Sequence, residues 1–441
     1  MKSTAKWIWF ANKCGVASTE MIEIYENFGS INAIYLADYE KYISLGINER
    51  LSERLSDKSL DDAYTIIKCC QDIGAGIISY ADERYPDSLR TLKDPPAVLY
   101  YLGELPDLNS NLCIAMVGTR KMSEYGMRAA YKIAYEIASS GAIVISGMAL
   151  GIDSVAASAA IEARGRTVAV LGCGIDVVYP KEHSRLRDAI IKNGAVITEY
   201  PPSEEPRGFH FPVRNRIISG LSQGIAVIDA DMKSGAMITA KTAILQGRDL
   251  YAVPSNIDSE NASGTNSLIR DGAHAVLCGN DIVKNYAYLF RDTLNIQKMR
   301  NAEEKSEYKA SVLSSLGVRA RGERPAFEGA SAQAERRQKE RVSAKTAQNK
   351  QSVPKAIEES AVPMVKTDSE TKTGGDESRA VLESLNEKQR RIFDEMPLDK
   401  PISVDYLTNT GFKLGEVISA LTVLEIKGLI SSLPGALYVR K

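Results

Sequence analysis

Short, continuous apolar runs alternate with helical segments between residues 111 and 290, and this alternation constrains the fold more than any other feature. The runs occupy 113–117, 142–146, 167–171, 195–199, 225–229, 249–253 and 274–277. A strand without polar alternation is buried on both faces, which is typical of a parallel sheet covered by helices on both sides. The region therefore predicts an α/β fold with a doubly wound, mostly parallel sheet.

The rest of the chain divides into three further segments. With 441 residues, the chain is long enough for about three domains. In residues 1–75, apolar side chains recur at helical spacing and are separated by glycine-containing breaks, so we expect an all-helical domain resembling SAM or helix-hairpin-helix modules. Such a domain can contact DNA or another protein, or it can simply pack against its neighbour. We assign the sheet domain to residues 76–295.

Residues 296–378 are dominated by small, polar and charged residues and are basic in the middle. Such a composition cannot bury enough apolar surface to offset the entropy of the chain, so we predict a disordered basic linker. A solvated linker is the simpler interpretation, and an electrostatic contact with nucleic acid is the alternative.

Residues 379–441 predict three helices followed by a hairpin at 429–439, the order of a winged-helix-like domain. The expected recognition helix carries Lys413, Glu416 and Glu425, a weak set of charges for gripping phosphates. Binding to a protein partner and binding to DNA therefore both remain open for this domain.

Composition limits the classes of function. The net charge of −1 gives no whole-chain signal for nucleic acid, so a basic surface would have to be local. The six cysteines show no metal-binding spacing and the three histidines are scattered, so we expect no metal and no cofactor. The sequence has neither an apolar run of membrane-spanning length nor a signal-like start, and we expect a reduced, cytoplasmic protein.

Unusual residues gather where the predicted strands end, which is where open α/β sheets bind ligands. Val117-Gly118-Thr119-Arg120 follows the first apolar run, and we expect its glycine to admit a ligand and the helix-opening amides to attract an anion. Arginine can bind a phosphate through two hydrogen bonds. Similar turns recur with further basic residues, and together they predict a cationic rim suited to a polyanion: Arg120, Lys181, Arg214, Arg216, Lys233 and Lys241. Phe211, beside the two arginines, is a candidate for stacking on a base or for burial in the core.

Catalytic motifs are missing from these turns. The sequence has no GxSxG elbow and no Walker A motif, and residues 118–123 do not supply a dinucleotide fingerprint. The carboxylates Asp153 and Asp176 could instead cap helices or tie loops together.

The motifs resemble, in order and across roughly 180 residues, those of the DNA-processing protein A family, also called DprA or Smf. The matching blocks are Val117 to Arg120, Ser146-Gly147 to Gly151-Ile152-Asp153, 167–180, Phe211 to Arg216, Ser234-Gly235 to Ala240, and 264–273. The resemblance implies an extended Rossmann-like fold that binds single-stranded DNA, forms a homodimer and helps to load the RecA recombinase during natural transformation. It implies no enzymatic activity and no membrane association.

The resemblance places the DNA contacts at matching positions of this sequence. They are Gly118, Thr119, Arg120, Lys181, Phe211, Arg214 and Arg216, with Lys233 and Lys241 as weaker candidates. The alternative is a nucleotide-acting enzyme of the phosphoribohydrolase type, which usually carries a Pro-Gly-Gly-x-Gly-Thr block that this chain lacks.

Two positions depart from the family pattern. Ala157 stands where members usually have a histidine, and Ser255 stands where they usually have a glycine. We expect the histidine to serve in helix packing, so that its loss is mild.

Overall fold

The computed structural model describes residues 2–303, 305–306, 309–318 and, with gaps, 385–440. These residues belong to two compact units, Met1–Lys339 and Glu340–Lys441. Among the described residues, no helix is both long enough and apolar enough to cross a membrane.

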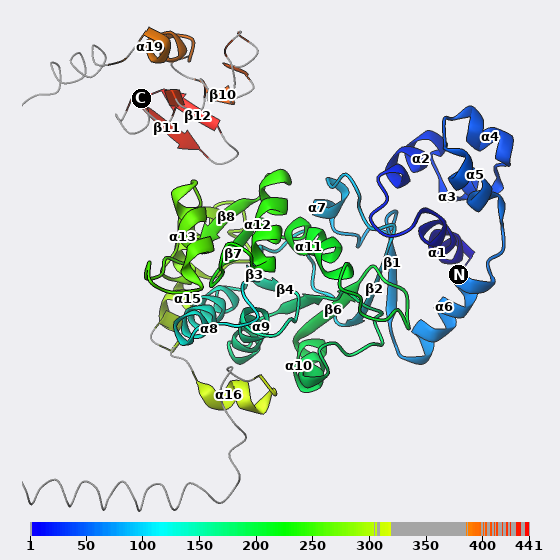
Figure 1. Ribbon diagram of the computed structural model, residues 1–441, viewed down its shortest axis with the longest axis horizontal. Helices are drawn as coiled ribbons and strands as arrows, with labels where there is room; N and C mark the ends of the chain where they lie inside the picture. The colour runs from blue at the N-terminus through cyan, green and yellow to red at the C-terminus, as the bar shows by residue number, and fades with distance from the viewer. Residues whose placement is uncertain are drawn as a thin grey trace, which may run out of the picture. The chain divides into compact units, whose positions relative to one another are not determined.

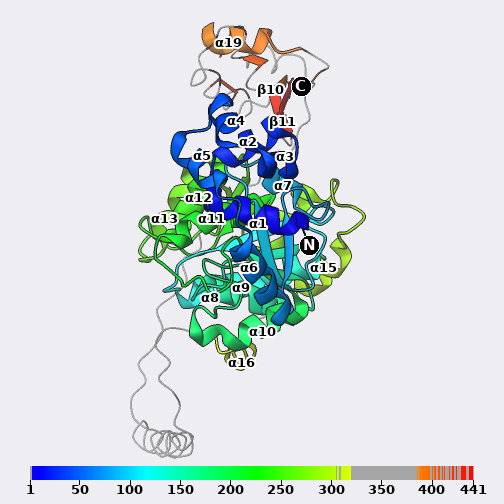
Figure 2. The same cartoon turned by 90° about the vertical axis from the view of Figure 1, so that its right-hand side faces the viewer.

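The chain begins with six short helices, which confirms the expected all-helical N-terminus: α1 (Lys2–Cys14), α2 (Glu20–Phe28), α3 (Ile31–Leu36), α4 (Tyr39–Ser44), α5 (Glu49–Ser56) and α6 (Asp61–Asp72). Ser30, Asp38 and Asn48 cap α3, α4 and α5 by accepting a hydrogen bond from an amide three residues ahead. The helices lie together at one end of the sheet (Figures 1 and 2), and buried Trp7 and Phe10 share one apolar core with it.

A nine-stranded sheet forms the centre of the first unit, in the order β1-β2-β6-β5-β4-β3-β7-β8-β9. Its strands are β1 (Gly76–Ser79), β2 (Val98–Gly103), β3 (Cys113–Val117), β4 (Ile143–Ser146), β5 (Thr167–Val170), β6 (Gly194–Thr198), β7 (Gly224–Val227), β8 (Asp249–Ala252) and β9 (His274–Ala275). Strands β3 to β9 are parallel, whereas β1 and β2 run antiparallel at one edge. Every predicted strand is present, but the sequence reading did not assign β1 or β2.

Helices cover both faces of this sheet, as the doubly wound prediction requires (Figure 1). One core holds α8 (Glu124–Ser139), α9 (Ile152–Glu162) and α10 (Ser184–Asn193); the other holds α7 (Asp87–Arg90), α11 (His210–Gly220), α12 (Gly235–Leu245) and α13 (Ala262–Arg270). Neighbouring side chains of β3 point into different cores: Ile114 lies in the first core and Ala115 in the second. The alternation explains why the strand is apolar throughout.

Helices continue past residue 296, where we expected a disordered linker to begin. After α14 (Gly279–Val283) and the short helix η2 (Lys284–Tyr286), the chain forms α15 (Ile296–Glu303) and α16 (Ala310–Ser315). Met299, Leu313 and Val318 are buried in the same core as α8 and α9. Buried Glu136 of α8 also accepts hydrogen bonds from the Gly279 amide (2.6 Å) and the Ser306 hydroxyl (3.0 Å). Packing against α8 and α9 thus overrides the polar composition of 296–318, while residues 319–378 lie outside the described residues.

The second unit contains α19 (Glu387–Asp394) and a small antiparallel sheet of order β10-β12-β11: β10 (Ile402–Ser403), β11 (Ile430–Leu433) and β12 (Leu437–Arg440). Its core includes Ile392, Phe393 and Leu407. The predicted hairpin is therefore present, and the winged-helix-like fold expected for this domain is confirmed below by its family match. Lys413, Glu416 and Glu425 of the expected recognition helix lie outside the described residues.

Candidate nucleic-acid interface

A cavity of about 650 Å³ opens beyond the carboxyl ends of the parallel strands. It is lined by the turn after β3, the loop before α9, and the first turns of α11 and α12. The chain runs from β3 to β4 on one side and returns to β7 on the other, so β3 lies at the point where the strand order reverses. Ligands of open α/β sheets bind at such switch points.

The turn after β3 is fixed by contacts within the protein. A Cβ on Gly118 would lie 2.4 Å from Ile152 Cγ1, so the glycine is required because the start of α9 packs against it. The Thr119 amide donates to the Asp229 carbonyl (2.6 Å), and the Lys121 amide donates to the Thr119 hydroxyl (3.1 Å). Gly118 and Thr119 thus shape the turn.

Buried Asp229 and the N-cap Ser123 complete this turn. The Ser123 amide donates to the Asp229 carboxylate (2.7 Å), and the Ser123 side chain accepts from the Gly126 amide (2.9 Å). The Ser123 and Gly126 amides therefore already have partners inside the protein and are not available to an anion.

Arg120 is exposed at the cavity, and its guanidinium lies 5.4 Å from the centre of the Phe211 ring. Phe211 is half-buried and also contacts the Tyr179 ring, with 5.3 Å between the ring centres. No carboxylate among the described residues forms an ion pair with Arg120. The cavity thus presents an exposed cation beside two aromatic rings.

Arg214 faces the same cavity but is only 4 % exposed. Its guanidinium donates to the carbonyl of Gly147 (3.0 Å), directly after β4, and to the carbonyl of Val170, the last residue of β5. Burial lowers the pKa of Arg214 to about 10, against the opposing effect of the Asp153 carboxylate. Arg214 therefore supports the floor of the cavity with a positive charge close beneath it.

Asp153 and Asp176 tie loops together, one of the two roles considered for them. The Asp153 carboxylate accepts from the Gly147 amide (3.0 Å) and the Ala149 amide (3.4 Å), and burial raises its pKa. The Asp176 carboxylate accepts from the Ser203 amide (2.7 Å).

Arg216 does not line the cavity, contrary to our prediction. Its side chain is 7 % exposed and forms ion pairs with Asp94 (3.3 Å) and with Glu199. A phosphate would have to displace both carboxylates to reach it. Arg216 instead joins the segment before β2 to the end of β6.

The three predicted lysines are exposed outside the cavity lining. Lys181 begins the short helix η1 (Lys181–His183), Lys233 lies in the turn before α12, and Lys241 lies on α12. None of the three lines the cavity with Arg120, so the single cationic rim that we predicted is not what the cavity shows.

Asn261 braces the site and was missed by the sequence reading. Its side-chain amide donates to the Lys121 carbonyl (2.9 Å) and to the Asp229 carboxylate (3.2 Å). No motif or spacing distinguishes this asparagine, because its partners are 32 and 140 residues away.

The two departures from the family pattern lie in structural positions. Ala157 is fully buried within α9. The Ser255 amide donates to the Asn266 side chain (3.1 Å), whose own amide donates to the Ser255 carbonyl (2.9 Å).

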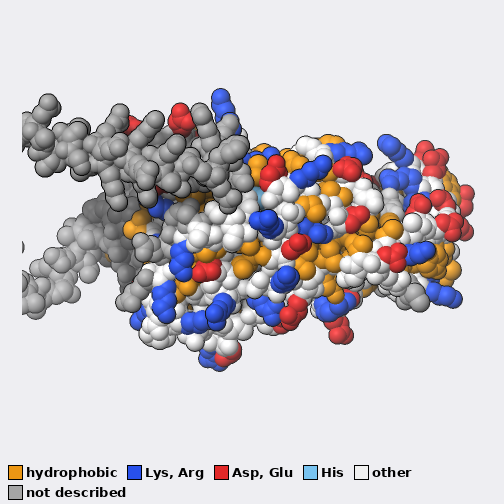
Figure 3. All heavy atoms as spheres, turned by 90° about the horizontal axis from the view of Figure 1, so that it is seen from below, with side chains coloured by type: hydrophobic (Ala, Val, Ile, Leu, Met, Phe, Trp, Pro, Cys, Tyr) orange, Lys and Arg blue, Asp and Glu red, His pale blue; other side chains and the backbone are white. Residues whose placement is uncertain are grey.

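The surface elsewhere mixes its charges. On the face in Figure 3, basic side chains stand among acidic and apolar ones in the part of the chain that the structure describes. No group of three or more candidate metal ligands occurs among the described residues. The cavity at the switch point is therefore the best-defined candidate for an anionic ligand.

Comparison with known proteins gives two family matches. The sequence profile of DNA recombination-mediator protein A matches residues 76–287, and that of the DprA winged helix domain matches residues 376–436. The DNA processing protein DprA of Bacillus subtilis (strain 168) is 38% identical over 217 residues, covering 49% of this chain and 73% of that protein.

The DNA processing protein DprA of Streptococcus pneumoniae is 40% identical over 210 residues, or 48% of this chain and 74% of that protein. Its X-ray structure aligns with 64% of this chain and 98% of that one, at 33% identity and a TM-score of 0.57. A structure of DNA processing protein A from Helicobacter pylori, described for its single-stranded DNA binding mode, aligns with 53% of this chain at 29% identity. Its TM-score of 0.43 is too low for a residue-level comparison.

Proposed function

Since the chain belongs to the DNA recombination-mediator protein A family of DNA-processing proteins, we propose that it binds single-stranded DNA in the cavity beyond β3. The observation that carries this proposal is the exposed Arg120 guanidinium beside the Phe211 ring, above the buried charge of Arg214. A phosphate would bind Arg120, and the neighbouring base would stack on Phe211.

The proposed recognition does not depend on sequence. Cationic side chains contact the phosphate backbone, and an aromatic ring accepts the face of any base. The closely packed turn after β3 fixes the backbone at Arg120, so the backbone does not have to be ordered on binding.

We propose further that the protein is not an enzyme and acts as a mediator in the cytoplasm. In this role it protects incoming single strands, forms a homodimer and delivers DNA to the RecA recombinase during natural transformation. Exposed Leu277, Tyr288 and Leu289, in the segment after the edge strand β9, support the homodimer because a second copy could bury them.

Fluorescence anisotropy with a labelled 20-nucleotide dT strand tests DNA binding. The wild type should bind this strand more tightly than a duplex of the same length. Phe211→Leu should weaken binding by about 1–3 kcal/mol for one stacked base. Phe28→Leu, in the N-terminal helices, is the matched control and should leave the affinity unchanged.

Equal affinity for duplex and single strand, or equal effects of the two substitutions, would overturn the proposal. The alternative of a nucleotide-acting enzyme predicts turnover of nucleoside monophosphates. If such turnover persisted through repeated purification and disappeared in a variant of the cavity, the protein would be a phosphoribohydrolase and not a mediator.

A further inference from the structure

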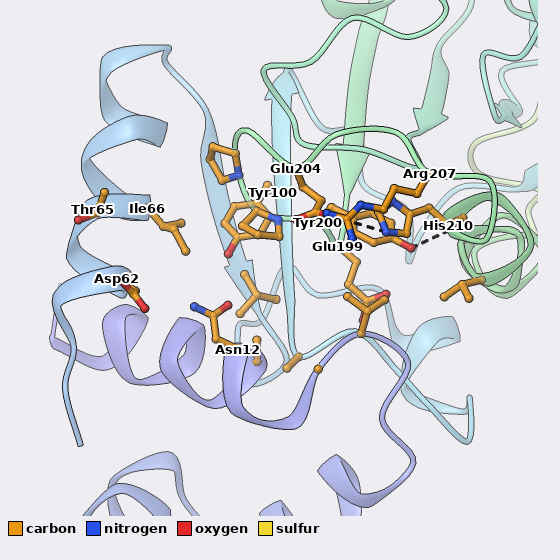
Figure 4. A pocket seen from close by; sticks show the side chains of 18 of the residues that line it. Asn12, Asp62, Thr65, Ile66, Tyr100, Glu199, Tyr200, Glu204, Arg207 and His210 are labelled. Carbon is orange, nitrogen blue, oxygen red and sulfur yellow. Dashed lines mark hydrogen bonds and ion pairs between the residues drawn. The ribbon is translucent and has the colours of Figure 1, made fainter. Parts of the chain in front are cut away.

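A second cavity, of about 860 Å³, lies between the N-terminal helices and the sheet domain. Its walls come from α1, α6, β2 and the segment 199–213, as Figure 4 shows. The start of α11 separates it from the DNA cavity: Phe211 and Arg214 line the latter, whereas His210 and Val213 line the former. None of the predicted DNA contacts lines this second cavity.

Aromatic rings form much of its surface. The Tyr200 and His210 rings stack with 4.2 Å between their centres, and the side chains of Tyr100 and Phe209 also line the cavity. Phe209 is 63% exposed although it is large and apolar. Rings arranged in this way favour a flat ligand.

The hydroxyl of Tyr100 is the most informative polar group. The residue is 1% exposed, its side chain points into the cavity (Figure 4), and no hydrogen bond joins its hydroxyl to the described residues. By contrast, the buried hydroxyls of Tyr42 and Tyr85 donate to the carbonyls of Ile34 (2.5 Å) and Pro96 (2.8 Å). The Tyr100 hydroxyl thus opens onto the cavity, where it can donate a hydrogen bond to a ligand.

Carboxylates outnumber basic side chains in the lining of the second cavity. Asp62, Glu199 and Glu204 line the cavity together with one cation, Arg207. Glu199 is occupied by Arg216, and Glu204 lies 3.6 Å from Arg207, whereas Asp62 has no ion pair with any described residue. The excess of carboxylates disfavours a phosphate here and favours a ligand with N–H donors.

From this arrangement we propose that the second cavity binds an uncharged purine ring that has adjacent N–H donors, as guanine has. The ring would lie against Tyr200 and His210, and its N–H groups would donate to Asp62. One of its acceptor atoms would accept a hydrogen bond from the Tyr100 hydroxyl. The purine comes either as a free nucleoside or as a base of bound DNA; only the second source rests on the function proposed above.

Calorimetric titration of the full chain with guanosine tests this site. We expect saturable binding, and Tyr100→Phe should weaken it about three- to tenfold, the range expected for one lost hydrogen bond. Tyr101→Phe is the matched control, because the next residue of a strand faces the other side and Tyr101 lines a different cavity. dGMP should bind no more tightly than guanosine.

Two further measurements distinguish the sources and the two proposals. A dT strand with one central dG should bind the wild type more tightly than all-dT, and Tyr100→Phe should abolish the difference, if the purine belongs to DNA. If the two strands bind equally well and guanosine still binds, the natural ligand of the second cavity is a free nucleoside. Arg120→Ala should leave guanosine binding intact, because Arg120 does not line the second cavity. A variant that loses only strand binding therefore bears on the proposed DNA binding and not on the purine site. Failure of guanosine to saturate the protein, or equal affinities for Tyr100→Phe and Tyr101→Phe, would overturn it.

Discussion

Three arginines that the sequence placed in one group have three different roles. Arg120 is exposed at the cavity, Arg214 supports it from below, and Arg216 is held by carboxylates away from it. The structure places Arg120 and Arg214 at one cavity, but residues two apart in a helix point in nearly opposite directions. Arg214 and Arg216 of α11 could therefore not both face one ligand, and the spacing alone was sufficient to show this.

The burial of Arg214 leads to a prediction about stability. Arg214→Met should reduce the free energy of unfolding by about 3–5 kcal/mol, because it leaves the Asp153 carboxylate without its neighbouring charge and two carbonyls without a donor. Urea unfolding followed by circular dichroism measures the change. A variant of wild-type stability that fails to bind DNA would instead make Arg214 a direct contact.

The sequence predicted the parallel strands of the sheet better than the antiparallel strands at its edge. All seven parallel strands were found because apolar runs buried on both faces have few alternative structures. The antiparallel strands β1 and β2 were missed because prolines close to β2 suggested a connection and β1 is only four residues long. In the same way, the packing of Met299 against α8 and α9 depends on partners far away in the sequence.

His183, which contacts the loop before α9, makes the free energy of unfolding depend on pH. It is 1% exposed, and its Nδ1 lies 3.0 Å from the carbonyl of Met148, a residue with a positive φ of 53° in the loop before α9. Because a carbonyl only accepts, we infer that this nitrogen carries a proton and holds the loop. Burial lowers the pKa of His183 below its usual value.

The unfolded chain therefore binds a proton at this histidine at a higher pH than the folded chain does. Stability is fully present above about pH 6.5 and falls as the pH decreases toward the folded pKa, by up to about 1.4 kcal/mol per unit. His183→Asn keeps a donor without titrating, so its urea midpoint should fall less between pH 7 and pH 5.5. Buried Glu136 and Glu199 have raised pKa values, so they favour the folded state as the pH falls. This effect is the same in the wild type and in His183→Asn, and it cancels in the comparison. Parallel pH profiles for the two proteins would contradict the role of His183.

At the scale of the whole molecule, the N-terminal helices and the sheet domain share one continuous core. The larger cavity lies where these two parts meet, as ligand sites in proteins often do. The family motifs pointed to the cavity beyond β3 but not to this one, because its lining residues come from four separate stretches of sequence and carry no motif.

The homodimer proposal predicts a change in mass. Leu277→Glu with Leu289→Glu should convert a dimer into a monomer, because each substitution places a charge in an apolar contact. Light scattering after size exclusion measures this, with Leu36→Glu, exposed on α3, as the control. A monomeric wild type, or a double variant that remains dimeric, would exclude this surface.

The central claim is that Arg120 binds a phosphate of single-stranded DNA. Its most direct test is the salt dependence of dT-strand affinity for Arg120→Ala, compared with Arg166→Ala. Arg166 is an exposed arginine at the opposite end of the strands, where it pairs with Glu104 (3.1 Å). We predict that loss of Arg120 weakens binding and reduces the slope of log affinity against log salt by about 0.7, the value for one phosphate contact on a single strand. The Arg166 variant should match the wild type, and an unchanged slope in Arg120→Ala would contradict the account.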